Sequence, residues 1–219
     1  MVNSKSSFWL ALIFTAAVFL VGMLLGATFE GMRSRGLQTN LINSETNLID
    51  QQLRNRAFTN FNINCDAAVK DLFVFADRIY EEAVQLERYD SASKFDSTPK
   101  ILHKRYDLLR MMLWSESIEI KKECSSNFHT LVYIYKYDDE DVDVSAEQSF
   151  YSRFLAEFKG EHPDDVLLIP FAGDTGLDSV NLVLGSYNIT ESDLPVIIVD
   201  EKTIIREVIT SDELENIVF

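Results

Sequence analysis

The sequence predicts an α/β protein in three parts: a transmembrane anchor (residues 1–30), a helical stalk built as an αα-hairpin of coiled-coil type (31–127), and a C-terminal βαβαββα domain (128–219). Three observations give this prediction. An uncharged apolar run lies near the N-terminus, two helical seams with steps of three and four residues follow it, and the last third alternates short apolar runs with helical patterns. Of the 219 residues, about 190 remain after the anchor, enough for one domain of ordinary size or for a small domain plus a helical stalk.

The anchor is expected over residues 8–29 (FWLALIFTAAVFLVGMLLGATF), which carry no charged side chain. At 1.5 Å per residue a helix of this length reaches about 33 Å, enough to cross a hydrocarbon core of about 30 Å. A cleaved signal peptide is the competing interpretation. Its apolar core is usually about 7–15 residues long, and an A-x-A site follows it. This run is longer and has no such site, so we expect a retained, single-pass anchor in the cell membrane.

Two features of the anchor bear on its orientation and partners. Lys5 on one side and Arg33 and Arg35, offset by Glu30, on the other nearly balance, so the positive-inside rule does not settle the orientation. Gly22 and Gly26 form a GxxxG motif, which lets two membrane helices approach closely. A homodimer through these glycines, or through the stalk, is therefore one hypothesis.

The stalk is expected to be helical from residue 37 to about residue 88, looser over the polar and Asn-rich stretch 37–61. After a turn over 89–97, Thr98 and Pro99 have the form of an N-cap and a first helical residue. The second helix runs to about residue 123. The seams that predict an antiparallel hairpin are Cys65, Val69, Leu72, Ala76, Ile79, Ala83 and Leu86 in the first helix and Leu102, Tyr106, Leu109, Leu113 and Ile120 in the second.

The two cysteines of the chain fall at one height of this hairpin. Cys65 lies 29 residues before a turn centre near residue 94, and Cys124 lies 30 residues after it. A disulfide is therefore reasonable if the Cα atoms are roughly 4.4–6.8 Å apart, and the alternative is two buried free thiols. A disulfide would place the body outside the cytoplasm. The sequon Asn188-Ile189-Thr190 agrees with that side and makes Asn188 a candidate glycosylation site.

The C-terminal third has the texture of an α/β domain. The expected strands are 129–136, 166–171, 194–199 and 203–209, with helices opened by a capping box at Ser145, over 179–187, and by a second capping box at Thr210. From Asp138 onward there are 20 acidic and 4 basic residues, whereas the preceding part has 15 and 16. An acidic unit repels phosphate, so nucleic acid is not expected as a partner.

No constellation of residues indicates a cofactor or a metal centre. The chain has no CxxC, and its three histidines are scattered, which argues against a structural zinc site. Asp139, Asp141 and Asp143 have the spacing of a calcium loop, but Val144 and Phe150 stand where the EF-hand pattern needs Gly and Glu. A solvated acidic loop is favoured over a weak cation site. The pairs Glu81-Glu82 and Lys121-Lys122 are expected on helix surfaces.

The order of elements from 128 to 219 resembles the core of the thioredoxin fold. The matching parts are the strand 131–136, the loop-to-helix step 137–148, the strand 166–171 and Leu194-Pro195-Val196. The resemblance implies that Pro195 is a cis-proline facing the functional edge. It also shows a departure, because residues 137–145 hold five carboxylates and no cysteine where redox members carry CxxC. The three-part plan is similar to uncharacterised archaeal membrane proteins with one anchor, a helical stalk and a thioredoxin-like end.

Three functional hypotheses follow. The favoured one is a membrane-tethered, non-catalytic binding or scaffolding protein that holds an unidentified protein partner, with the disulfide stapling its hairpin. A second is a thiol-disulfide redox protein that uses Cys65 and Cys124 as a reversible pair. A third is a stalk whose task is self-association through the anchor and residues 37–61.

Overall fold

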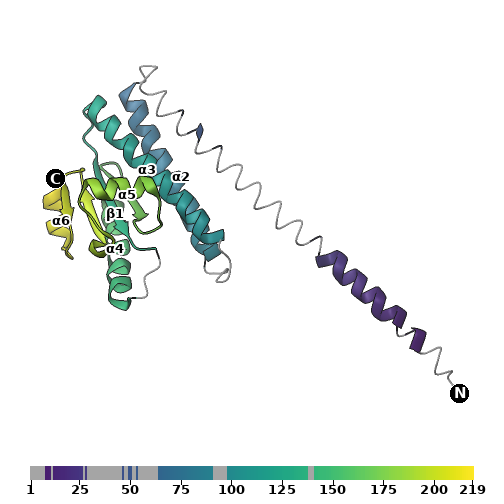
Figure 1. The fold of residues 1–219 in the computed structure, drawn as a ribbon. Coiled ribbons are helices and arrows are strands. Elements are labelled where there is room, and N and C mark those ends of the chain that lie inside the picture. The colour runs from purple at the N-terminus through teal and green to yellow at the C-terminus, as the bar shows by residue number, and fades with distance from the viewer. Residues whose placement is uncertain are drawn as a thin grey trace. The chain divides into compact units, whose positions relative to one another are not determined.

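The computed structural model describes part of the chain in detail (Figure 1), namely residues 8–10, 12–26, 28, 46, 49–50, 53, 64–90, 98–137 and 141–219. The chain consists of two compact units, and the second, residues 54–219, contains both the helical hairpin and the sheet. Asp139 and residues 91–97 lie outside the described residues, as does most of the helix expected over 37–61.

The N-terminal unit contains a helix over Phe8–Gly26, which has 19 residues and a mean hydropathy of 2.5. Among the described residues it is the one helix long and apolar enough to cross a membrane, so this part of the anchor prediction is confirmed in length and composition. A side chain added at Gly22 or Gly26 would meet nothing within 4 Å.

The hairpin consists of α2 (Cys65–Asp90) and α3 (Thr98–Cys124), which lie side by side in Figure 1. Asn64 caps the start of α2, since its Oδ1 accepts a 2.9 Å hydrogen bond from the Asp66 N–H and its backbone carbonyl accepts from the Ala68 N–H. The buried face of α2 is Ala68, Leu72, Phe75 and Ile79. These residues keep the expected steps of three and four, but the face is turned from the predicted seam, of which Leu72 and Ile79 are fully buried.

The sheet has four strands, β1 (His129–Tyr135), β2 (Val166–Ala172), β3 (Val196–Val199) and β4 (Thr203–Ile205), in the order β2-β1-β3-β4. β1 runs parallel to β2 and antiparallel to β3, and β3 runs antiparallel to β4. The helix α4 (Val142–Glu161) follows β1, α5 (Asp178–Ser186) follows β2, and α6 (Ser211–Val218) follows β4. The prediction of a mixed α/β protein is confirmed.

The two faces of the sheet have different helical covers. Leu131, Tyr133, Ile197 and Val199 share a core with side chains of α4 and α6, among them Tyr151, Leu155, Phe158, Leu214 and Val218. The opposite face receives Trp114 of α3, whose ring centroid lies 6.1 Å from that of Phe171. Because β-strand side chains alternate, the sheet is buried on both faces and forms the middle layer of three.

The two edges of the sheet are protected in different ways. β2 is an edge strand, as its Pro170 allows, and it contacts α3. The Asp107 carboxylate of α3 accepts a 3.1 Å hydrogen bond from the Ala172 N–H. A side chain therefore satisfies a backbone donor on the outer side of this strand. β4 at the other edge has three residues. A covered edge and a very short edge both prevent edge-to-edge association.

Three expected boundaries are wrong, and the first is that the strand expected over 194–199 begins at Val196. The strand expected over 203–209 ends at Ile205, because its partner β3 begins after Pro195, which has no N–H to donate. The helix expected to open at Ser145 begins at Val142, with Asp141 as its N-cap. Gln148 does not complete a capping box, because its side chain bonds the backbone of Lys136 instead. The second capping box, at Thr210 and Glu213, is confirmed.

Tyrosine burial predicts a loss of stability at alkaline pH. Burial raises the pKa of Tyr106 to about 12 and the pKa of Tyr151 to about 12, from 10.0. The folded state therefore holds these protons more tightly than the unfolded state, and stability falls as pH rises from 10 toward 12. The slope is about 1.4 kcal/mol per pH unit for each tyrosine.

A single substitution separates this effect from general alkaline unfolding. The Tyr151 hydroxyl is buried and has no hydrogen-bond partner among the described residues, so Tyr151→Phe is expected to be neutral or slightly stabilising at pH 7. Above pH 10 the variant should lose stability less steeply than the parent. Urea midpoints measured at pH 7, 10 and 11 test this, and parallel loss in both proteins would contradict it.

Candidate functional site

The carboxyl ends of β1 and β2 meet the start of β3 at one edge of the sheet. The peptide bond between Leu194 and Pro195 is cis, and Pro195 directly precedes β3. Because Val196 pairs with Ile134, Pro195 lies beside the last residue of β1, Tyr135. We call this region the cis-proline edge. It lies at the carboxyl ends of the parallel strands, where ligands bind in open α/β sheets.

Side chains from other elements form hydrogen bonds with the backbone groups of the cis-proline edge. Gln148 of α4 accepts the Lys136 N–H at 2.6 Å and donates to the Lys136 carbonyl at 3.3 Å. The Asp174 carboxylate accepts the Tyr137 N–H at 2.8 Å, and the Gly173 N–H donates to the Tyr135 carbonyl. The end of β1 is therefore fixed in place by hydrogen bonds rather than left open.

A polar cluster of α3 lies against the same edge. The Asp107 carboxylate is fully buried, accepts the Ala172 N–H and lies 3.2 Å from His103 Nδ1. His103 Nε2 lies 3.3 Å from the Tyr135 hydroxyl, which also accepts from Arg110 at 3.4 Å. We call His103, Asp107, Arg110 and Tyr135 the His103 cluster.

The hydrogen bonds of the His103 cluster run in one consistent direction when the imidazole is neutral. Arg110 donates to Tyr135, Tyr135 donates to His103 Nε2, and His103 Nδ1–H donates to Asp107. Burial raises the pKa of the Tyr135 hydroxyl, which keeps it protonated and able to donate. The Tyr137 ring covers His103, with centroids 4.2 Å apart. A hydroxyl enclosed in this way is a structural group rather than an exposed nucleophile.

A second polar cluster binds α3 to the sheet at the start of β1, the end opposite to the cis-proline edge. Lys121 Nζ donates to Asp200 Oδ1 at 2.6 Å, to Thr130 Oγ1 at 3.1 Å and to Glu201 Oε2 at 3.3 Å. His129 Nδ1 lies 2.6 Å from Asp200 Oδ2. Trp114 Nε1 and Thr130 Oγ1 both donate to Glu201 Oε1. We call these residues the Lys121 cluster.

The Lys121 cluster holds a turn in an unusual conformation. Asp200 and Glu201 connect β3 to β4 with φ values of 46° and 59°, as a type I′ turn requires. Such turns prefer Asn-Gly, because most side chains are disfavoured at positive φ. Burial alone would raise the pKa of the Asp200 carboxyl, but the hydrogen bonds from Lys121, His129 and the Thr130 N–H lower it below 3.8 overall. The contacts of the two acidic side chains explain why they are tolerated here.

Two adjacent lysines provide a matched test of the Lys121 cluster. Lys121→Met removes the cation between two carboxylates and should cost about 2 kcal/mol, whereas Lys122→Met on the exposed side of α3 should change stability by less than about 0.5 kcal/mol. The Asp200 contribution is present above pH 3.8 and is lost as pH falls through its lowered pKa. Urea midpoints of the two variants should therefore differ at pH 7, and the difference should shrink as the pH is lowered below 3.8. Equal midpoints at pH 7 would contradict the assignment.

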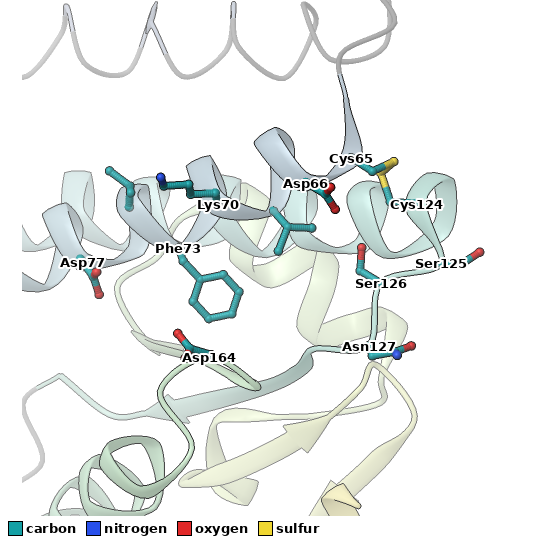
Figure 2. A pocket seen from close by; sticks show the side chains of 12 residues that line it. Cys65, Asp66, Lys70, Phe73, Asp77, Cys124, Ser125, Ser126, Asn127 and Asp164 are labelled. Atoms are coloured by element: carbon teal, nitrogen blue, oxygen red, sulfur yellow. A yellow bond between two sulfur atoms is a disulfide. The ribbon is translucent and has the colours of Figure 1, made fainter.

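An open groove of about 600 Å³ lies beside the disulfide. Figure 2 shows its wall on α2, from Cys65 to Asp77, and the segment Cys124–Asn127 at one end. The Phe73 ring projects toward the segment of Asp164 (Figure 2), and Lys159 Nζ lies 4.9 Å from its centroid. Burial lowers the pKa of Lys159, against the charges of Asp77, Asp164 and Asp165. The half-buried Lys159 therefore offsets part of the acidic charge beside the groove.

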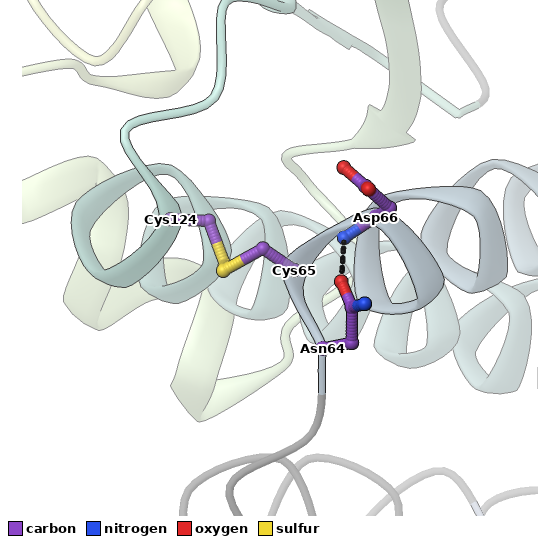
Figure 3. The surroundings of a disulfide bond; sticks show 4 residues. All are labelled: Asn64, Cys65, Asp66 and Cys124. Atoms are coloured by element: carbon purple, nitrogen blue, oxygen red, sulfur yellow. Dashed lines mark hydrogen bonds between the residues drawn. A yellow bond between two sulfur atoms is a disulfide. The ribbon is translucent and has the colours of Figure 1, made fainter.

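The structure brings some of the predicted site residues together and separates others. Cys65 and Cys124 are paired at an S–S distance of 2.06 Å and a Cα separation of 5.5 Å (Figure 3). They lie at the end of α3 that precedes β1, whereas Pro195 lies at the far end of β1. Asp141 is the N-cap of α4 and accepts from the Asp143 N–H. No group of three metal-ligating side chains is found among the described residues.

Several residues of the two clusters were not expected from the sequence. The expectation that Lys121 is a surface residue is wrong, because 18% of its side chain is exposed and it bonds three partners. His103, Asp107 and Arg110 do not form a recognisable sequence motif. The available signal was the breadth of the apolar stripe of α3, which included Leu108, Leu109, Leu113 and Trp114 and indicated a helix buried on two sides.

Comparison of the chain with protein-family models, with curated proteins and with solved structures gives no match. The geometry of the described residues is therefore the basis of the functional interpretation.

Proposed function

We propose that this chain is a membrane-tethered, non-catalytic binding or scaffolding protein whose folded unit is a thioredoxin-like module without redox cysteines. The N-terminal helix tethers it as a single-pass protein, and the folded unit lies on the extracytoplasmic side, where a disulfide persists. One observation carries the proposal: the cis-proline edge is closed by Gln148, Asp174 and Asp107, while both cysteines of the chain are joined in the hairpin.

The topology of the sheet supports the thioredoxin-like part of the proposal. The strand order β2-β1-β3-β4, one parallel pair and an antiparallel β3 agree with the core that the sequence resembles. The cis bond before β3 stands where that resemblance puts it. A fold can retain its scaffold while its site changes, so the topology does not imply redox activity.

The start of α4 differs from a redox site in position as well as in composition. Gln148 lies at the level of Lys136, and α4 begins six residues earlier, so its first turns extend about 9 Å past the end of β1. Val142 in this extension is 78% exposed. The extension and the cis-proline edge together form the surface that we assign to a protein partner.

A reversible thiol-disulfide function is the second candidate, favoured by the position of the disulfide in the wall of the open groove. Full-length protein in detergent micelles should show no catalysed reduction of a fluorescent disulfide substrate by dithiothreitol, and the Cys65→Ser/Cys124→Ser double variant is the matched control. Turnover by the parent that Cys124→Ala abolishes would establish the redox function instead. Equal background rates in both proteins support the non-catalytic proposal.

Site-specific photo-crosslinking tests the binding surface. A photoreactive residue at position 142 should give a discrete adduct in native membranes, whereas the same residue in place of Leu182, which is 77% exposed on α5, should not. An adduct of twice the 25.1 kDa chain mass would identify a homodimer, as the self-association hypothesis expects. Equal adducts from the two positions would contradict the assigned surface.

A further inference from the structure

The end of α5 has a defined cap with an asparagine at its centre. The Ile189 N–H donates to the Leu184 carbonyl at 2.9 Å, and the Asn188 N–H donates to the Gly185 carbonyl at 3.2 Å. This pair of bonds is a Schellman motif, and the buried side chains of Ile189 and Leu184 supply its apolar contact. Asn188 stands at the left-handed position with φ 52°. Glycine is the usual residue there, so the cap itself does not require asparagine.

The side chain of Asn188 is presented to solvent. Asn188 is exposed, and its side-chain carboxamide makes no hydrogen bond with the described residues. It is the one asparagine of the chain that is followed by any residue and then Ser or Thr. Ile189 is 5% exposed and fixes the backbone on one side, so a group attached to Asn188 would project outward without displacing core side chains.

We propose that Asn188 is an N-glycosylation site and that the chain carries a glycan at the C-terminal end of α5. The proposal rests on the extracytoplasmic orientation given under the proposed function. The co-reactant is a lipid-linked oligosaccharide. The amide nitrogen bonds to the anomeric carbon of the sugar, the bond from that carbon to the lipid phosphate oxygen breaks, the phosphate leaves, and the amide loses one proton.

The Thr190 hydroxyl is hydrogen-bonded in the folded chain. In the folded chain the Thr190 hydroxyl donates to Asp193 at 2.7 Å and takes part in the cap of the short helix Glu191–Asp193. The hydroxyl that completes the sequon is therefore occupied after folding. Transfer requires this hydroxyl to leave the cap, and the folded structure accommodates the product at an exposed position.

The test uses full-length protein isolated from its native membranes, with mass spectrometry of the peptide that contains residue 188. The parent and Thr190→Ser should carry the same added hexose-containing mass, and Thr190→Ala should lose it. Asn188→Gly should lose the mass and keep the urea midpoint, because glycine suits the left-handed cap. Asn181→Gln, at an exposed position of α5 outside any sequon, should keep the modification.

Parallel alkylation of thiols before lysis separates this inference from the proposed function. Unmodified Asn188 together with an oxidised cysteine pair would overturn the glycosylation site and leave the extracytoplasmic proposal standing. Unmodified Asn188 with free thiols would overturn both. A modified Asn188 that persists in Thr190→Ala would also overturn the assignment, because the mass would then not depend on the sequon.

Discussion

Replacing both cysteines by serine is expected to lower the free energy of unfolding by about 4 kcal/mol. The bond between Cys65 and Cys124 closes a loop over a sequence separation of 59, and removing it restores the freedom of that loop in the unfolded chain. The native hairpin retains its apolar contacts, so the variant should still fold. The expected result is a lower urea midpoint, with little loss of helix content in the absence of urea.

The measurement can be made on full-length protein in detergent micelles. The chain has two tryptophans, Trp9 and Trp114, so a Trp9→Phe background leaves Trp114, which is 3% exposed beside Phe171, as the fluorescent reporter. Reducing the parent with dithiothreitol should shift the midpoint as far as the double serine variant does. An unchanged midpoint in both would show that the disulfide does not constrain the unfolded chain.

Asp107→Ala is expected to cost about 3 kcal/mol, because two hydrogen-bond donors lose their acceptor and each buried donor left unsatisfied costs about 1 to 3 kcal/mol. The substitution leaves the Ala172 N–H and His103 without their acceptor, and both lie at the cis-proline edge. It also uncovers the outer edge of β2. Under the proposed function, the variant should lose the crosslink from position 142 together with its stability.

Two companion variants show whether the hydrogen bonds or the negative charge matter. Asp107→Asn keeps the shape and one acceptor oxygen, so it should recover part of the lost stability. Glu157→Gln removes an exposed carboxylate of α4 and should change the urea midpoint little. If Asp107→Ala were as stable as the parent, the buried carboxylate would not hold α3 to β2, and the proposed role of the His103 cluster would be wrong.

The elements of the fold that were predicted are those in which local sequence and burial agree. β1 has a run of β-branched and aromatic residues and is buried on both faces, and Thr210 with Glu213 opens α6 as a capping box. The cysteine pairing followed from equal distances along two antiparallel helices, which depend on helix rise alone. Elements of this kind carry their own signal in a short stretch of chain.

The two polar clusters were not predicted because their partners are distant in sequence. Lys121 bonds Asp200 and Glu201, which lie about eighty residues further along the chain, and Asp107 bonds Ala172 after a separation of 65. Helix periodicity classifies such residues as surface or seam and contains no information about a sheet that packs against them. The start of α4 was predicted wrongly for the same reason, since the Gln148 side chain accepts a hydrogen bond from the Lys136 N–H instead of capping the helix.

The position of the disulfide determines how a mechanical load would pass through the folded unit. Cys65 is the first residue of α2, where the chain arrives from the N-terminal helix, and Cys124 is the last residue of α3, five residues before β1. Tension applied through the N-terminal segment therefore passes from Cys65 across the sulfur atoms to Cys124 and directly into the central strand. The 58 residues between the two cysteines carry none of this tension. Pulling on the N-terminal segment therefore cannot extend the loop between the two cysteines while the disulfide is intact.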